Sequence, residues 1–308
     1  MNKVALKDIS KNISSGLTPL RSNENFWSSP DIPWVKTEQL GTKNIYDSNE
    51  KISREALEKT SIKLNPANTI SVAMYGEGKT RGSVSILKTE TTTNQACCNI
   101  YLDEDKADYE YVYYFLKTQY KELRNLSSGV RKNLNSGDIK GFEIRLPSCI
   151  DDQRAIAKVL SDIDEKIDLN NKINAELEAM AKLIYDYWFV QFDFPSDAAE
   201  NKGKPYKSSG GKMVYNEELK REIPEGWSCT KLANVIEKSG TGLNPRDNFK
   251  LGEGSNYYIT IKSISNGRIV FNDKCDRVSD ESLKIIDKRS DLQVGDVLFT
   301  SIQPVGVT

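Results

Sequence analysis

Residues 151–189 read DDQRAIAKVLSDIDEKIDLNNKINAELEAMAKLIYDYWF and contain neither glycine nor proline. Apolar side chains in this segment recur at steps of three and four residues, the spacing that places them on one face of an α-helix. The pattern predicts a single amphipathic helix of about 55–60 Å. Its apolar stripe comprises Ile156, Leu160, Ile163, Ile167, Leu177, Ile184 and Trp188, with Asn170 and Asn174 in line between them.

The apolar stripe has a heptad-like spacing, which is typical of helices that pack on other helices. Asn170 and Asn174 would weaken such a seam while fixing its register and its partner. Residues 151–190 also carry nine Asp or Glu against five Lys or Arg, a charge that would repel nucleic acid. A core helix with two solvated asparagines is the alternative. Length and acidity favour a coiled-coil-type helix that binds another helix.

Residues 1–150 show short β-rich segments alternating with helical ones, which predicts a mixed α/β domain. A helix is expected over residues 109–126, where apolar side chains again recur at steps of three and four. The expected strands cover residues 34–35, 69–74, 83–88, 98–102 and 142–146.

An internal repeat relates the two ends of the chain. Leu6 and residues 16–19 (GLTP) recur in the same order as Leu232 and residues 242–245 (GLNP). The expected fold class is therefore α+β, with two α/β domains in tandem, the second incomplete, on either side of the long helix. The expected boundaries are 1–150 for the first domain, 151–192 for the helix, 193–226 for a linker containing a Gly/Ser/Lys-rich run, and 227–308 for the second domain.

Composition excludes several kinds of chemistry. The 308 residues include no histidine, which rules out Ser-His-Asp and Cys-His catalytic groups and removes the commonest zinc ligand. The five cysteines form no Cys-x-x-Cys, so no metal site or disulfide is expected. A phosphate-binding loop ending at Thr80 would need glycine where Ala73 stands, and no cofactor is predicted. Without a secretion signal or an apolar run long enough for a membrane span, the protein is expected in the cytoplasm.

The net charge of −1 hides an uneven distribution. Residues 1–147 carry 21 Lys or Arg and 18 Asp or Glu, a net charge of +3. Two glycine-flanked loops in this part are rich in donors that suit phosphate oxygens and base edges. We expect both loops to converge on one DNA-facing surface. A solvated hairpin tip would explain the first loop equally well, and by spacing alone simple surface solvation explains the second better than DNA contact. The candidate DNA-binding residues are Lys79, Thr80, Arg81, Arg131, Lys132 and Asn133, with Arg21 and Lys36 as weaker candidates.

Several motifs together resemble one known family. They are Leu146-Pro147, Asp152-Gln153-Arg154-Ala155-Ile156-Ala157, Asp164-Glu165-Lys166-Ile167, Tyr187-Trp188-Phe189 and Ile223-Pro224-Glu225-Gly226-Trp227. The first four look like the first central conserved region of the DNA specificity subunit of type I restriction–modification systems. The last resembles the entry into that family's second target-recognition domain.

This resemblance implies a non-catalytic subunit that binds double-stranded DNA. In that family each of two target-recognition domains reads half of a bipartite site, and paired helices set the distance between them. Methylation subunits supply the S-adenosylmethionine chemistry, and a motor-nuclease subunit cleaves. The incomplete second domain and the missing second helix depart from that pattern. If this chain is a natural product, we expect it to self-associate through the apolar stripe, antiparallel, and to read an inverted repeat.

Two rival functions come from other classes. An interaction scaffold would use the long helix without contacting bases, and the near-neutral net charge slightly favours it. An enzyme that works with carboxylates alone is the third interpretation. The tandem repeat on either side of a long helix favours DNA recognition over both.

Overall fold

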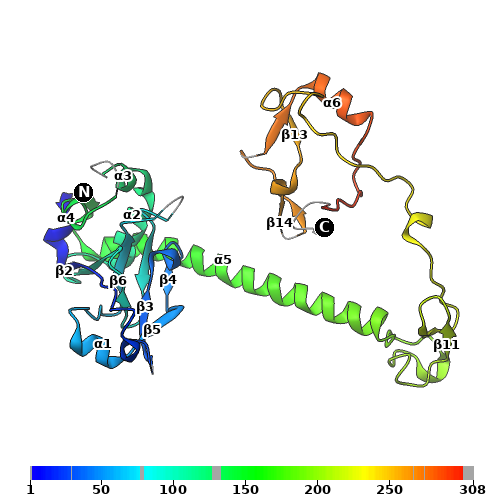
Figure 1. Cartoon of the computed structure of the whole chain (residues 1–308), viewed down its shortest axis with the longest axis horizontal. Coiled ribbons are helices and arrows are strands. Elements are labelled where there is room, and N and C mark those ends of the chain that lie inside the picture. Colours follow the sequence, from blue (N-terminus) through cyan, green and yellow to red (C-terminus); the bar gives the residue numbers. More distant parts are fainter. Residues whose placement is uncertain are drawn as a thin grey trace. The chain divides into compact units, whose positions relative to one another are not determined.

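The computed structural model describes residues 2–28, 30–76, 80–126, 133–265, 267–273 and 275–300. The chain forms two compact units, Met1–Leu183 and Ile184–Thr308 (Figure 1). The first unit contains a five-stranded sheet, a three-stranded sheet, a two-stranded ribbon and most of the long helix. The second contains a β-hairpin and a smaller α/β body.

A five-stranded sheet forms the centre of the first unit. Its strands, in spatial order, are β2 (Ser10–Ser15), β9 (Cys97–Leu102), β6 (Thr69–Ala73), β7 (Val84–Leu87) and β4 (Asn44–Ile45). All neighbours are antiparallel except β4 and β7, which are parallel. Every residue of β6 and β7 is buried, including the polar Thr69, Ser71 and Ser85, which alternate with the apolar residues of these strands.

The two faces of this sheet have separate cores. The larger core packs strand residues such as Ile70 and Cys98 against Val112 and Leu116 of helix α2 (Tyr109–Thr118). Cys97 belongs to the smaller core on the other face, as expected for adjacent strand residues. Burial raises the pKa of both thiols to about 12, so they stay protonated at neutral pH.

The helix predicted over residues 109–126 is in fact two helices. After α2, the backbone leaves helical geometry at Gln119 and resumes as α3 (Tyr120–Asn125). Asp108 starts α2 because its carboxylate accepts a hydrogen bond from the Tyr111 amide at 2.9 Å. The remaining elements beside this core are α4 (Ser136–Lys140) and the ribbon of β1 (Asn2–Ala5) with β10 (Glu143–Leu146).

A second sheet has three strands, in the spatial order β5 (Glu50–Ile52), β3 (Ile32–Val35) and β8 (Thr92–Thr93). Helix α1 (Arg54–Lys59) directly follows β5 in the chain. Its core centres on Trp34, which is 2% exposed and packs with Phe26 and Ile52. The Trp34 indole donates a hydrogen bond to the Leu17 carbonyl at 3.0 Å. Short 3-10 turns cover Leu6–Ile9, Glu24–Phe26, Thr37–Gln39, Ala199–Asn201, Leu232–Asn234 and Ile261–Ser263.

The long helix α5 covers Ile150–Tyr185 and continues as a π-helical turn over Asp186–Val190, which confirms the helix predicted over 151–189. Its first turns pack on the first domain through Gln153, Ala157 and Ser161, which are all buried. The sequence pattern did not identify this face, since its residues are small or polar. The apolar stripe points elsewhere and is exposed.

The segment expected as a linker folds into an ordered hairpin. Strands β11 (Met213–Asn216) and β12 (Arg221–Pro224) pair in antiparallel register. Beside the hairpin, the Phe194 ring stacks on Tyr206 at 4.8 Å and on Trp227 at 5.3 Å between centroids. These aromatic contacts stabilise a segment whose glycines, serines and lysines had indicated a flexible connection.

The body of the second unit confirms the internal repeat. Strands β13 (Asn256–Tyr258) and β16 (Asp276–Val278) pair as β3 and β5 do, and each pair leads into a short helix, α6 (Asp280–Asp287) or α1. Ser279 caps α6 through its hydroxyl, as Ser53 caps α1. A further ribbon joins β14 (Ile264–Ser265) to β15 (Arg268–Ile269).

The repeat extends to individual hydrogen bonds. The Tyr258 hydroxyl donates to the Leu243 carbonyl at 2.6 Å, in the place of the Trp34–Leu17 bond. Tyr258→Phe should therefore lower the opening free energy of residues 243–258 by about 1 kcal/mol. Hydrogen exchange of the backbone amides in residues 243–258 measures this free energy. The control is Tyr257→Phe, because Tyr257 is the neighbouring residue and is 40% exposed. Equal effects of both substitutions would contradict the prediction.

Candidate nucleic-acid interface

The first candidate loop connects β6 to β7. Thr80 and Arg81 lie in it and are half-buried, whereas Lys79 lies outside the described residues. Gly82 adopts a φ of +83°, and a Cβ there would lie 3.1 Å from the Arg124 side chain and 3.5 Å from the Tyr120 ring. The loop therefore returns to β7 against α3, where only glycine combines this backbone conformation with this close approach.

The second candidate loop follows α3. Arg131 and Lys132 lie outside the described residues, and Asn133 is exposed. The Leu134 amide donates a hydrogen bond to the Met74 carbonyl at 3.1 Å, and the Leu134 side chain is buried in the larger core. This bond joins the end of the second loop to the beginning of the first. The anchoring residues of both loops therefore lie side by side.

Arg124 is a basic residue at this place that the candidate set did not include. Its guanidinium donates to the Tyr120 hydroxyl at 2.7 Å, within α3 and next to Gly82. The spacing of four residues between a tyrosine and an arginine on one helix was the available signal. This spacing could not reveal that the loop ending at Gly82 packs against Tyr120 and Arg124.

Arg21 and Lys36 lie together at the other sheet. The Glu50 carboxylate, on β5, forms ion pairs with Arg21 at 2.6 Å and with Lys36 at 2.7 Å. The Arg21 guanidinium also lies 3.7 Å from the Trp27 ring centroid. Hydrogen bonds from Arg21 and then Lys36 lower the pKa of Glu50. This pair interaction stabilises the fold above the unfolded pKa of Glu50 and is lost as the pH falls through the lower folded value.

The apolar stripe of α5 and of the π-helical turn that follows it is exposed at each of its apolar positions. Its exposed fractions are 41% for Ile156, 40% for Leu160, 53% for Ile163, 51% for Ile167, 57% for Leu177, 42% for Ile184 and 37% for Trp188. Asn170 and Asn174, which continue the stripe, are exposed as well. A row of exposed aliphatic side chains of this length is typical of a protein–protein contact.

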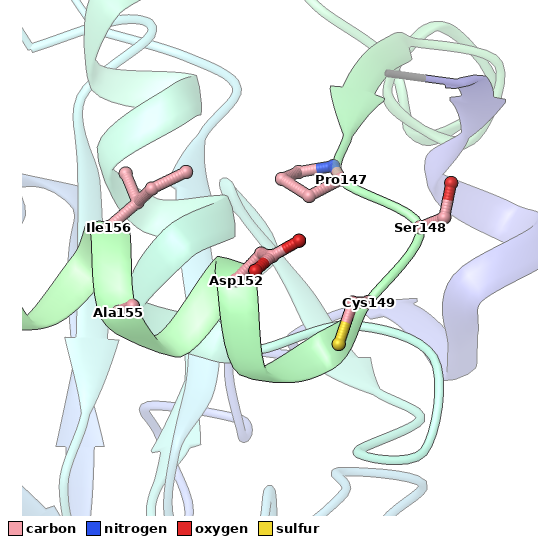
Figure 2. A pocket seen from close by; sticks show the side chains of 6 residues that line it. All are labelled: Pro147, Ser148, Cys149, Asp152, Ala155 and Ile156. Carbon is pink, nitrogen blue, oxygen red and sulfur yellow. The ribbon is translucent and has the colours of Figure 1, made fainter.

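An open hollow of about 540 Å³ lies at the start of α5, where the stripe begins (Figure 2). Ile156, Ala155 and Asp152 line it from the helix, and Pro147, Ser148 and Cys149 line it from the preceding turn. In the described part of the chain, no three Cys, Asp or Glu side chains are grouped to hold a metal ion. Among the same residues, no helix is long and apolar enough to span a membrane.

The fold and these surfaces define a class of protein: an α/β domain with two anchored, donor-rich loops, followed by a long helix with an exposed apolar stripe. Residues 1–179 match the family model described as "Type I restriction modification DNA specificity domain". The chain belongs to this family, which confirms the resemblance seen in the sequence.

Two relatives show the extent of the similarity. The chain is 30% identical over 268 residues to the type I restriction enzyme MjaIX specificity subunit of Methanocaldococcus jannaschii, covering 85% of this chain and 57% of that protein. It is 25% identical over 188 residues to the EcoR124I/EcoR124II specificity subunit of Escherichia coli, covering 58% and 45%. The chain thus spans about half the length of these relatives. Among solved structures, a type I S subunit from M. genitalium aligns with a TM-score of 0.45 and 22% identity, covering 62% of this chain and 46% of that one.

Glu50→Gln tests whether Arg21 and Lys36 face DNA. The substitution removes the carboxylate that neutralises both cations, so DNA affinity should rise and the slope of log K against log salt should steepen by about one to two charges. Filter binding over a salt series measures both quantities. Glu38→Gln, which removes only the 62% exposed second partner of Lys36, is the control and should change them less. Affinity unaffected by Glu50→Gln would place these residues away from DNA.

Proposed function

We propose that this chain is the sequence-specific DNA recognition subunit of a type I restriction–modification complex. The observation that carries the proposal is the Leu134–Met74 backbone bond, which joins the two donor-rich loops of a net-basic domain. In this proposal each recognition domain reads one half of a bipartite site in double-stranded DNA. Methylation and motor-nuclease subunits supply the chemistry, and the chain itself is a non-catalytic, cytoplasmic component.

The side chains of the two loops have the chemistry for both parts of DNA binding. Lys79, Thr80 and Lys132 are suited to phosphate oxygens, which position a protein on the duplex. Arg81 and Arg131 can bond two acceptors of guanine, and Asn133 can bond adenine, in the major groove. Because the anchoring residues of both loops lie side by side, the two loops can contact the same half-site.

In this proposal α5 contacts protein and not DNA. Its excess of acidic residues repels phosphate, and its exposed stripe needs an apolar partner. Burying a single Leu or Ile side chain contributes roughly 1.5–3 kcal/mol, so the stripe supports a stable contact. The partner is a second amphipathic helix, which a second copy of this chain can supply in antiparallel orientation.

The exposed stripe also favours a second candidate function, an interaction scaffold that never contacts bases. The two functions differ in how binding responds to salt. A DNA-reading subunit releases counterions, so log K falls steeply as log salt rises, whereas a scaffold has no DNA binding to weaken. Methylome sequencing of cells that carry the gene is the direct test, because a recognition subunit leaves a bipartite methylated motif.

Arg81→Ala and Arg131→Ala should each weaken binding to the methylated motif, in the assembled complex, by about 1–3 kcal/mol if the arginine bonds a base. The loss should be larger for the specific site than for random DNA. Lys63→Ala, an exposed basic residue of the first domain away from both loops in sequence, is the control. Unchanged affinity in both arginine variants would remove the loops from the interface.

Ile163→Asp should disrupt assembly while the first domain stays folded. The Ile163 side chain is 53% exposed, so a carboxylate there is solvated in the free chain but buried without a partner in a helix pair. Sedimentation of the purified chain, alone and with methylation subunits, measures assembly. Lys172→Asp, on the opposite side of α5, is the matched control. An Ile163→Asp chain that assembles normally would contradict the role of the stripe.

A further inference from the structure

The contact between α5 and the first domain is confined to the beginning of the helix. Gln153, Ala157 and Ser161 are buried and Asp164 is half-buried, one residue per turn along one face. Every residue from 165 to 183 is exposed. Three turns therefore determine the direction in which the rest of the helix leaves the domain.

A buried amide forms the first point of this contact. Gln153 is 1% exposed, and its carbonyl oxygen accepts a hydrogen bond from the Asp108 amide at 3.0 Å. Its side-chain nitrogen donates to the Pro147 carbonyl at 3.0 Å and to the Lys106 carbonyl at 3.4 Å. A tilt of the helix start would break one of these bonds and leave a buried polar group without a partner, which is unfavourable.

A tyrosine–carboxylate bond forms the second point. The Tyr114 hydroxyl, on α2, donates to the Asp164 carboxylate at 2.6 Å and accepts from the Lys43 ammonium at 2.8 Å. Lys43 also pairs with Glu110 at 3.5 Å, one turn before Tyr114. Burial, followed by the hydrogen bond to Asp164, raises the pKa of Tyr114, so the hydroxyl keeps its proton and remains a donor.

The residues between the two points allow a close approach. Ala157 is 2% exposed and belongs to the larger core, and Ser161 is 8% exposed. Larger side chains at these positions would hold the helix away from α2 and lengthen both hydrogen-bonded contacts. This face of α5 thus allows a close approach to the first domain and buries little apolar area.

We infer that Gln153 and the Tyr114–Asp164 pair form a two-point attachment that fixes the angle between the recognition domain and α5. A single point would leave the helix free to pivot, whereas two points separated along its axis hold it. These three side chains are positioning residues, since they act through the helix and not on DNA.

The inference has a consequence for DNA spacing, which rests on the proposed function. The helix rises about 16 Å from Gln153 to Asp164 and about 45 Å from Gln153 to Leu183. A sideways movement of about 1 Å at Asp164 therefore becomes about 3 Å at Leu183. That is close to the rise of one base pair, about 3.4 Å. Loss of the Tyr114–Asp164 bond should therefore weaken the preference for one distance between the two half-sites.

Spin-label distance measurements on the full chain test the attachment itself. Labels at Lys63 and Glu178, both exposed, report the angle after Cys149→Ser and Cys229→Ser remove the accessible native thiols. Tyr114→Phe and Asp164→Ala should each widen the distance distribution about two-fold, because the helix pivots on Gln153. Asp164→Asn should stay near the wild-type width, because its amide oxygen can still accept the bond.

Tyr109→Phe is the matched control, since this hydroxyl, also on α2, accepts from Lys88 at 3.2 Å. It should leave the width unchanged. Unchanged widths in both Tyr114→Phe and Asp164→Ala would overturn the inference. Equal widening in Tyr109→Phe would also overturn it, because the effect would then be a general loosening of α2.

A second measurement uses the chain assembled with methylation subunits and DNA sites whose spacers differ by one base pair. The wild-type complex should prefer one spacer, and the ratio of affinities should fall toward one in Tyr114→Phe. A variant with a wider distribution but an unchanged spacer preference overturns the consequence for spacing. A wild-type complex without sequence-specific binding refutes the proposed function, and the distance measurements then decide on the attachment alone.

Discussion

The buried Gln153 amide joins three backbone groups at the point where the first domain ends and α5 begins. Hydrogen bonds depend on direction as well as distance, so a buried amide with three partners specifies an orientation in a way that an apolar contact cannot. The helix can consequently dock with very little apolar area. Its aliphatic side chains stay available on another face, where they remain exposed along the whole length of the helix.

Helix α5 docks with one face and exposes its apolar stripe on another, and this separation explains what the sequence could and could not predict about the helix. Periodic apolar residues predicted the helix and nearly its limits, because the period depends only on helical geometry. They did not predict the docking face, because Gln153 and Ser161 have the composition of a solvated surface. Only the three-dimensional course of residues 106–108 and 147 gives the Gln153 side chain its partners.

The same reasoning applies to the loops and the hairpin. Glycines on either side of donor-rich residues predicted the two loops. The ion pairs of Arg21 and Lys36 with Glu50 could not be predicted in this way, because they depend on the β3–β5 register, which places Trp34 opposite Glu50. The hairpin of the second unit was missed because its aromatic stack joins residues far apart in sequence. Phe194, Tyr206 and Trp227 have no common period, whereas the glycines and serines between them are conspicuous.

The Leu134–Met74 bond has a consequence for how such a protein changes over generations. Both atoms belong to the main chain, so the bond is indifferent to the identity of the side chains at either position. Substitutions within the two loops can change the side chains they present without breaking this bond, since loops tolerate variation in composition and length. Under the proposed function, new binding preferences are therefore accessible by small mutational steps on an unchanged framework.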